Sequence, residues 1–168
     1  AAAMPQMMKL EKYGETNEGR DLLLAFVSTP ENMAKLDEIR KNNLRLTGML
    51  KDKPADVTAP VIVWLSYNVH GNEASSSEVS MKTLYELLNP SNAQTKNWLK
   101  NVVVMIDPCL NPDGRDRYVN WVTQMTGKNA DANINSREHS EPWPGGRVNH
   151  YNFDLNRDWA WQTQVETQ

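Results

Sequence analysis

Two residues with metal-binding side chains stand three positions apart, directly after an apolar run. His70 and Glu73 belong to Asn68-Val69-His70-Gly71-Asn72-Glu73, which follows Val61–Tyr67. Where a strand leads into a helix, this spacing lets an imidazole nitrogen and a carboxylate reach one ion from the same side. A catalytic zinc uses three protein ligands and a water, so the pair would supply two of the three. Taken alone, it is also compatible with a capping Glu beside an ordinary His.

Two arginines and two asparagines follow further along the chain. They lie within twelve residues, in Gly146-Arg147-Val148-Asn149 and Asp154-Leu155-Asn156-Arg157. A guanidinium group binds a carboxylate in a two-pronged geometry, and one that faces a carbonyl can stabilise a developing oxyanion. Each run in isolation is equally compatible with solvated arginines and with asparagines in turns. Asn111-Pro112-Asp113-Gly114 is typical of a turn, with Pro at its second position and Gly at its fourth.

Apolar patterning predicts the strands that would position these residues. Leu22–Ser28 and Val102–Ile106 are short apolar runs typical of strands. Val61–Tyr67 is almost uninterruptedly apolar, which predicts a central strand buried on both faces. The segment from Asn111 to Asn152 is instead rich in polar and turn-forming residues, and it predicts a long ordered loop. Its part from Arg115 to Gly145 could shape a specificity pocket or a lid.

Helices are predicted between the strands. Thr29 is a suitable N-cap, with Pro30 at the first helical position of a surface helix that continues to residues 41–43. Ala93–Lys100 is a shorter candidate. Ala74–Leu88 is the most regular one, and we expect it to pack on the sheet through Met81, Leu84, Tyr85 and Leu88. This order of strands and helices predicts an α/β fold with a mixed, mainly parallel central sheet flanked by helices.

Five runs together resemble, in order, the motifs of carboxypeptidase A-like zinc carboxypeptidases. They are Gly14–Arg20 (GETNEGR), His70–Ala74 (HGNEA), Asn111–Gly114 (NPDG), Gly146–Asn149 (GRVN) and Asp154–Arg157 (DLNR). The HGNEA run and the nine-residue step from Arg147 to Asn156 resemble the carboxypeptidase N/E branch more closely than the digestive enzymes. In the digestive enzymes an Arg usually stands where this chain has Asn72.

The resemblance implies a zinc metallocarboxypeptidase that releases C-terminal residues from peptides by metal-activated water. His70 and Glu73 would be zinc ligands, with one Zn²⁺ in a complete domain, and Arg147 would polarise the scissile carbonyl. Asn156 and Arg157 would bind the free C-terminal carboxylate of the peptide substrate. The resemblance assigns no chemistry to the runs at 14–20 and 111–114, which look like turns that position their neighbours.

The family pattern continues beyond the last residue of this sequence. Its third zinc ligand is a His well downstream of the Asn-Arg pair, and its general base is a Glu further on, so both would follow Gln168. His139 and His150 precede Asn156, which is the wrong order for that ligand. We therefore expect residues 1–168 to be the N-terminal portion of a single catalytic domain, incomplete at its C-terminal end, with residues 1–10 a candidate linker or tag. Zinc binding by this chain should be weak or absent, and the chain should be inactive alone.

Composition sets broad limits on partners and location. The 168 residues include 39% apolar residues and six Trp, enough for the core of one domain, and the formal charge of −3 gives no basic footprint for nucleic acid. The longest apolar run is far too short to cross a bilayer. Cys109 stands alone, which excludes an internal disulfide and a multi-thiolate zinc site. We expect a secreted or periplasmic location, although Ala1–Leu10 lacks the features of a signal peptide.

Two other functions are compatible with parts of this pattern. An amide-cleaving deacylase of the aspartoacylase type also uses a His-x-x-Glu pair. A non-catalytic module could recognise terminal carboxylates without cutting. The Asp-Leu-Asn-Arg and Asn-Pro-Asp-Gly runs fit the carboxypeptidase pattern better than the deacylase pattern.

Overall fold

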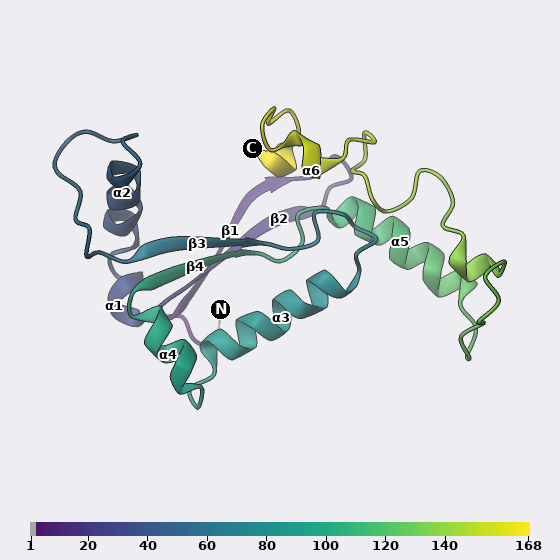
Figure 1. The fold of residues 1–168 in the computed structure, drawn as a ribbon, viewed down its shortest axis with the longest axis horizontal. Coiled ribbons are helices and arrows are strands. Elements are labelled where there is room, and N and C mark those ends of the chain that lie inside the picture. The colour runs from purple at the N-terminus through teal and green to yellow at the C-terminus, as the bar shows by residue number, and fades with distance from the viewer. Residues whose placement is uncertain (1–2) are drawn as a thin grey trace. The chain divides into compact units, whose positions relative to one another are not determined.

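The protein has an α/β fold in which helices flank a four-stranded mixed sheet, as predicted (Figure 1). The computed structural model describes residues 3–168. The strands are β1 (Met8–Glu15), β2 (Asp21–Val27), β3 (Val61–Ser66) and β4 (Val102–Asp107). The α-helices are α1 (Pro30–Met33), α2 (Leu36–Leu46), α3 (Ser75–Leu88), α4 (Ala93–Leu99), α5 (Pro112–Met125) and α6 (Leu155–Asp158), and two short 3₁₀ helices are η1 (Arg137–His139) and η2 (Val165–Thr167).

The chain divides into two compact units. The first contains the described residues up to 11, together with 24–65 and 80–107. The second contains 12–23, 66–79 and 108–168. Every residue to which we assigned chemistry belongs to the second unit.

The strand order in the sheet is β1-β2-β4-β3. All three predicted strands are confirmed to within a residue or two, whereas β1 was not predicted because its alternating charged residues obscure the apolar pattern. β3 and β4 run in the same direction in Figure 1. β2 instead pairs antiparallel with β4, with Ala25 opposite Ile106. The sheet is mixed because β2 enters it from the turn that follows β1 and not from a helical crossover.

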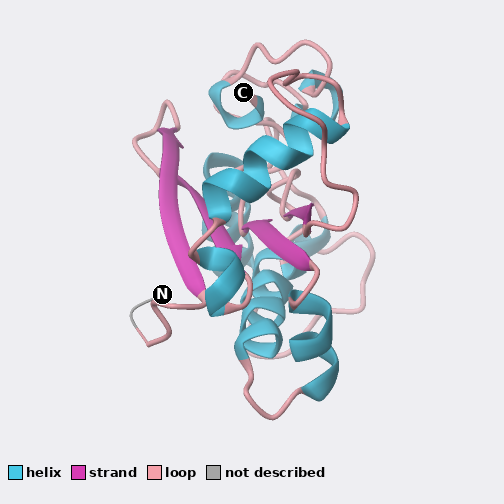
Figure 2. Cartoon of the chain, turned by 90° about the vertical axis from the view of Figure 1, so that its left-hand side faces the viewer, coloured by secondary structure: helices cyan, strands magenta, loops and turns pink. Residues whose placement is uncertain are grey.

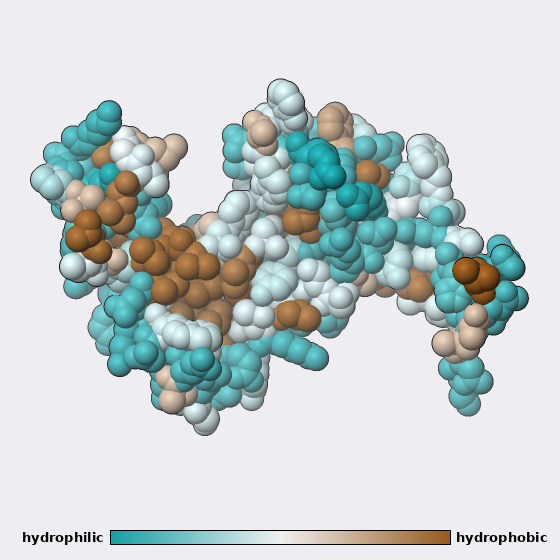
Figure 3. Space-filling view, viewed as in Figure 1, coloured by the Kyte–Doolittle hydropathy of each residue, from teal (hydrophilic) through white to brown (hydrophobic). Residues whose placement is uncertain are grey.

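The prediction that Val61–Tyr67 is a central strand buried on both faces is wrong. β3 is the last strand in the sheet order, and Val61, Val63 and Trp64 are 44%, 39% and 48% exposed. Figure 3 shows apolar side chains gathered over the start of this strand. β4 is the buried strand of the pair, since Val103 and Ile106 are fully buried. An apolar run predicts a strand, but it does not say which neighbours cover that strand.

Helix α3 is confirmed, but its predicted buried face is correct only at Leu84. Met81 and Tyr85 are exposed, and the buried residues are Ser80, Leu84 and Leu87. These three follow the spacing i, i+4, i+7, so they form a stripe one position away from the predicted one. The stripe begins at a serine, which apolar patterning cannot detect.

The predicted surface helix after Thr29 is two helices. The Thr29 side chain accepts a hydrogen bond from the Asn32 backbone N–H and Pro30 stands first, as predicted, but α1 ends after one turn. Its successor α2 buries the Arg45 side chain, which is paired with Glu38 and Asp52. The hydrogen bond from Arg45 lowers the pKa of Asp52 to about 2.

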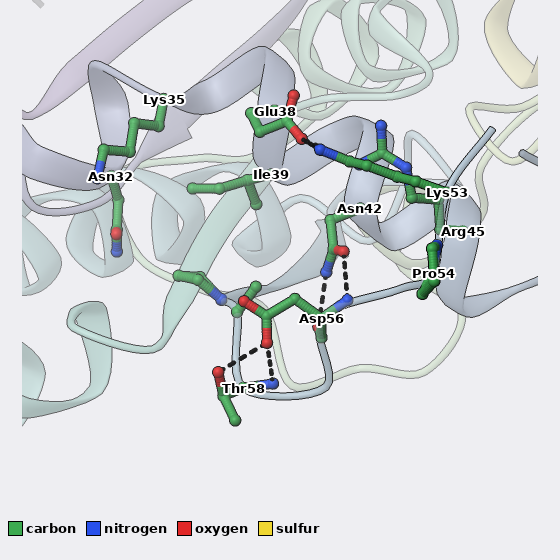
Figure 4. Close-up of a pocket in the computed structure, with 12 residues that line it drawn as sticks. Asn32, Lys35, Glu38, Ile39, Asn42, Arg45, Lys53, Pro54, Asp56 and Thr58 are labelled. Atoms are coloured by element: carbon green, nitrogen blue, oxygen red, sulfur yellow. Dashed lines mark hydrogen bonds and ion pairs between the residues drawn. The ribbon is translucent and has the colours of Figure 1, made fainter.

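A cavity of 460 Å³ lies between α2 and the loop that precedes β3 (Figure 4). Its polar side chains mostly bind one another: Arg45 and Lys53 both pair with Glu38, and the Asn42 side chain exchanges hydrogen bonds with the backbone of Asp56. The groups that could recognise a ligand are therefore largely occupied within the protein. This cavity is not the candidate site.

Residues 112–125, predicted as part of a long loop, form helix α5. Asn111 is its N-cap, with its side-chain oxygen 2.9 Å from the Gly114 backbone nitrogen, and Pro112 is its first residue. The turn predicted at Asn111–Gly114 is thus the start of a helix. Most of residues 126–154 is loop, drawn pink in Figure 2, and η1 lies within it. Among the described residues, no helix is long and apolar enough to cross a membrane.

Candidate active site

The loop after β3 is shaped by Asn68. This residue has a φ of 54°, a left-handed conformation that Asn tolerates better than most residues. Its side-chain amide donates to the His70 carbonyl at 2.6 Å, and its side-chain oxygen accepts from Ser77 at 2.6 Å. The Asn68 backbone N–H donates to the Ser76 hydroxyl at the start of α3. These bonds hold the loop in a tight bend and fix where His70 stands.

His70 and Glu73 come together as the sequence predicts. His70 is 6% exposed, and its Nδ1 lies 3.1 Å from Oε1 of Glu73. The other ring nitrogen, Nε2, lies 3.0 Å from Oδ1 of Asp154. The imidazole is therefore bracketed by two carboxylates, one on each nitrogen.

Arg147 joins the same cluster from a distant part of the chain. Its Nε and Nη2 donate to Oδ2 of Asp154 at 3.2 and 2.9 Å, and its Nη1 lies 3.4 Å from Nδ1 of His70. Burial favours the neutral form of Asp154, but hydrogen bonds from His70 and Arg147 outweigh it and lower the pKa of this carboxyl. Asp154 thus holds the imidazole and the guanidinium in one arrangement.

Both ring nitrogens of His70 face carboxylates, which only accept hydrogen bonds. A metal ion between His70 and Glu73 would need an Nδ1 without a hydrogen, and Nε2 would then carry the hydrogen that Asp154 accepts. Nδ1 then presents its lone pair towards Glu73. Two ligand atoms on one tetrahedral zinc lie about 3.4 Å apart, close to the separation of Nδ1 and Oε1. The donor set therefore fits one zinc ion with an imidazole, a carboxylate, and a second carboxylate that orients the imidazole.

Within residues 3–168, no group of three or more His, Cys, Asp or Glu is placed to hold a metal. His139 is bonded to the Asp131 carbonyl in its own loop. His150 pairs with Glu18 and packs edge-on against Tyr151. Both histidines serve local packing, and neither adds a ligand to the pair at 70 and 73.

Asn156 and Arg157 lie in α6, immediately after Asp154. The Asp154 side chain caps this short helix by accepting from the Asn156 backbone N–H. Arg157 lines a cavity of 350 Å³ together with Phe153, Asp154 and Trp161. The predicted carboxylate-binding pair is therefore linked to the metal pair through Asp154, which takes part in both sets of contacts.

Three of the five motifs meet through glycine. A Cβ added to Gly71 would lie 2.1 Å from the Arg115 backbone nitrogen and 2.6 Å from the Gly146 carbonyl oxygen. A Cβ added to Gly114 would lie 2.4 Å from that same oxygen. Only glycine permits so close an approach of three backbone segments. The contact brings His70 and Glu73 next to the segment that holds Arg147.

The first and third motifs are joined by buried polar contacts. Asp113 is fully buried, and its Oδ1 accepts from the Thr16 hydroxyl at 2.7 Å and from Arg20 at 2.8 Å. Arg20 also pairs with Glu18 and Asp116. These residues hold the turn between β1 and β2 against the start of α5, which is the positioning role expected of both motifs.

Sequence reasoning assigned no role to Asp154 or Glu141. Asp154 lies within a quoted motif, and a carboxylate two residues before the predicted substrate-binding pair is a signal that was available. Glu141 lies in a segment without periodicity. Its contacts with Asn72 and the Gly146 backbone depend on how the loop folds, so no local pattern reveals them.

Comparison with known families identifies the family to which this chain belongs. The family model for zinc carboxypeptidases matches residues 1–168. This chain belongs to the zinc carboxypeptidase family. Among curated proteins, none matches the sequence significantly.

Solved structures support the fold of this zinc carboxypeptidase chain. It resembles a metallo-carboxypeptidase from Burkholderia cenocepacia with a TM-score of 0.59 and 18% identity, over 99% of this chain and 33% of that one. Structures described as a carboxypeptidase A from Shewanella denitrificans and a carboxypeptidase from Burkholderia mallei give TM-scores of 0.56 and 0.57. Their identities are 20% and 18%, over 99% of this chain and 30% and 32% of theirs. The chain thus spans about a third of the length of these structures.

Proposed function

We propose that this chain contributes part of the active site of a zinc metallocarboxypeptidase, which releases C-terminal residues from peptides. The family and the fold support a hydrolase of this kind. The observation that carries the assignment of residues is the meeting of His70, Glu73 and Arg147 around one point. These residues span 77 positions between His70 and Arg147, and no local element brings them together.

We assign His70 and Glu73 as zinc ligands. Bound zinc would polarise the scissile carbonyl and lower the pKa of a water ligand. With a metal on Nδ1, Nε2 of His70 carries the hydrogen that Asp154 accepts. Asp154 therefore acts as a positioning residue for the ligand and for Arg147.

We assign Arg147 as the catalytic cation. Two of its nitrogens are held by Asp154, while Nη1 faces the side of His70 that carries the ligand lone pair. A guanidinium held there can donate to the carbonyl oxygen of a peptide bond as negative charge develops on it. Fixing the group in advance avoids reorganisation during the reaction.

We assign Asn156 and Arg157 to the terminal carboxylate of the peptide. Arg157 lines a cavity, and its side-chain hydrogen bond to the Asn156 carbonyl is 3.5 Å long. A guanidinium with donors to spare can bind a carboxylate with two parallel hydrogen bonds. The substrate class is thus a peptide with a free C-terminus, whereas the preferred terminal side chain is not specified.

The test begins with the isolated 168-residue chain. Because only two ligands are assigned, we expect weak zinc binding in calorimetry and no turnover of peptides with free C-termini. A complete protein site binds zinc with a free energy of roughly 10 kcal/mol or more. The loss of one of three ligands removes several kcal/mol of that binding free energy. Tight stoichiometric binding together with turnover would show that the chain completes its own site, and the partial-site assignment would be wrong.

The second stage uses the natural gene product that contains this chain. We expect zinc-dependent release of C-terminal residues, and no cleavage of the same peptides when their C-termini are amidated. Arg147→Ala should lower kcat by about 10²-fold to 10³-fold, as loss of an oxyanion donor does, without weakening zinc binding. Arg137→Ala, a substitution of another arginine in the long loop, is the control. Equal cleavage of free and amidated peptides would contradict the proposal.

A further inference from the structure

We propose that Glu141, in the long loop after α5, is a positioning residue that fixes Arg147 relative to His70 and Glu73. The inference rests on the proposed function, because it concerns how that same site is assembled. Its role depends on two hydrogen bonds that join the metal-binding loop to the backbone of the arginine loop.

Each carboxylate oxygen of Glu141 has its own donor. Oε2 accepts from the side-chain amide of Asn72 at 3.0 Å, and Oε1 accepts a short hydrogen bond from the Gly146 backbone N–H. Asn72 stands between the two proposed zinc ligands, and Gly146 is the residue before Arg147. One side chain therefore connects Asn72, which precedes Glu73, to Gly146, which precedes Arg147.

Other contacts also hold this segment: Arg117 donates to the Val148 and Asn149 carbonyls, and Asp154 accepts from the Arg147 side chain. The glycines at 71, 114 and 146 define how closely the three segments can approach. A steric limit of this kind prevents closer approach but does not prevent separation. Next to Arg147, separation is resisted by the bond between Glu141 and the Gly146 backbone N–H and by the bond from the Asn111 side-chain amide to the Arg147 carbonyl at 3.2 Å.

The chemistry of the side chain suits this bridging role. A carboxylate has two acceptor oxygens and no donor, and hydrogen bonds to an ionised acceptor are stronger than those between neutral groups. Gly145 has a φ of 67°, and a Cβ there would lie 3.4 Å from the Glu141 carboxylate. The turn before Arg147 is thus built around this carboxylate.

Loss of Glu141 should weaken stabilisation of the transition state more than binding of the substrate. Arg147 is proposed to act on charge that develops during the reaction, so displacing it lowers kcat and leaves KM nearly unchanged. A displacement of about 1 Å can cost about 100-fold in rate. For Glu141→Ala we expect kcat to fall about 10-fold to 100-fold. Zinc affinity should stay within about twofold, because Asp154 orients His70 independently.

The deciding experiment is a double-mutant cycle on the natural gene product that contains this chain. If Glu141 acts through Arg147, Glu141→Ala should change kcat by less than about twofold once Arg147→Ala is present. Additive effects in the double mutant would overturn the proposal. Glu138→Ala is the matched control, because Glu138 belongs to the same loop and accepts from the Asp131 backbone instead. A fall in kcat as large for Glu138→Ala would show that loop order, and not this connection, is what matters.

A second readout does not require activity. In hydrogen exchange, the Gly146 amide should exchange faster in Glu141→Ala and in Asn72→Ala than in the wild type, while the Gly114 amide, bonded to Asn111, should not change. Unchanged exchange at Gly146 would overturn the proposed connection even in an active enzyme. If the wild type hydrolyses no peptide while Gly146 responds as expected, the proposed function fails and the bridging geometry stands.

Discussion

At the scale of single residues, the sequence predicted the side chains that meet in the candidate site but not the role of Asp154. His70, Glu73 and Arg147 were predicted to meet from their types and from the family resemblance, and the structure brings them into contact. Asp154, which joins His70 to Arg147, was not assigned a role although it lies within a motif, because a motif does not show which groups a carboxylate binds. Motifs can predict the residues that would contact a metal or a substrate, whereas the residues that orient them depend on tertiary structure.

Glu166 gives a prediction at the same scale. Burial, together with the nearby charges of Asp113 and Asp158, raises the pKa of this carboxyl above its ordinary value of 4.5, although a hydrogen bond from Asn149 opposes the shift. The folded state therefore holds the Glu166 proton more tightly than the unfolded state. Its contribution to stability is fully present below pH 4.5 and is lost as the pH rises through the raised value.

We expect Glu166→Gln to be more stable than the wild type near neutral pH and no more stable below pH 4.5. The free energy of unfolding in urea, measured across this range, tests the expectation. The control is Glu31→Gln, because the Glu31 carboxyl is exposed and its pKa is lowered, which is the opposite direction. A stability difference between Glu166→Gln and wild type that does not change with pH would contradict the argument.

Helix α5 shows why an element can be missed when its first residues form a familiar turn pattern. Asn111-Pro112-Asp113-Gly114 fits a turn, but an Asn cap with Pro at the first position also begins helices. The residues of this helix are polar on average, and its buried residues are Asp113 and Gly114, so apolar patterning did not correct the interpretation. By contrast, the strands β2 and β4 and the helices α3 and α4 were predicted with nearly correct bounds.

The glycine contact between the motifs gives a prediction at the scale of elements. Gly71→Ala would place its Cβ 2.1 Å from backbone atoms of α5, and backbone cannot move aside as a flexible side chain can. We expect a loss of about 1–3 kcal/mol or more in the free energy of unfolding. Gly127→Ala is the control, because its Cβ would meet only one atom, at 3.6 Å, and should change stability by less than about 0.5 kcal/mol. Equal effects of the two substitutions in urea unfolding would contradict this account.

At the scale of the whole molecule, the exposure of β3 is the largest departure from the sequence prediction. Whether an apolar strand is covered depends on neighbours that its own residues do not encode. A last strand with exposed Val61, Val63 and Trp64 presents an apolar surface, and such strands favour association between molecules. The isolated chain should therefore aggregate as its concentration rises.

Val63→Lys should reduce that aggregation, because a charged side chain on the last strand opposes pairing with another molecule. Light scattering of the isolated chain as a function of concentration measures the effect. Val57→Lys introduces the same charge at an exposed loop position and is the matched control. If both substitutions reduce scattering equally, net charge and not the strand is responsible.

The exposed tryptophans also determine which spectroscopic signal suits the unfolding measurements. Trp64, Trp98, Trp143 and Trp161, four of the six in the chain, have exposed side chains. An indole already in contact with water emits at nearly the same wavelength before and after unfolding, so intrinsic fluorescence should report the loss of this fold only faintly. The same indoles should be readily reached by a soluble quencher in the native state. Circular dichroism of the helices is therefore the better signal for the unfolding experiments. Fluorescence is better suited to detecting the binding of another molecule that covers the exposed tryptophans.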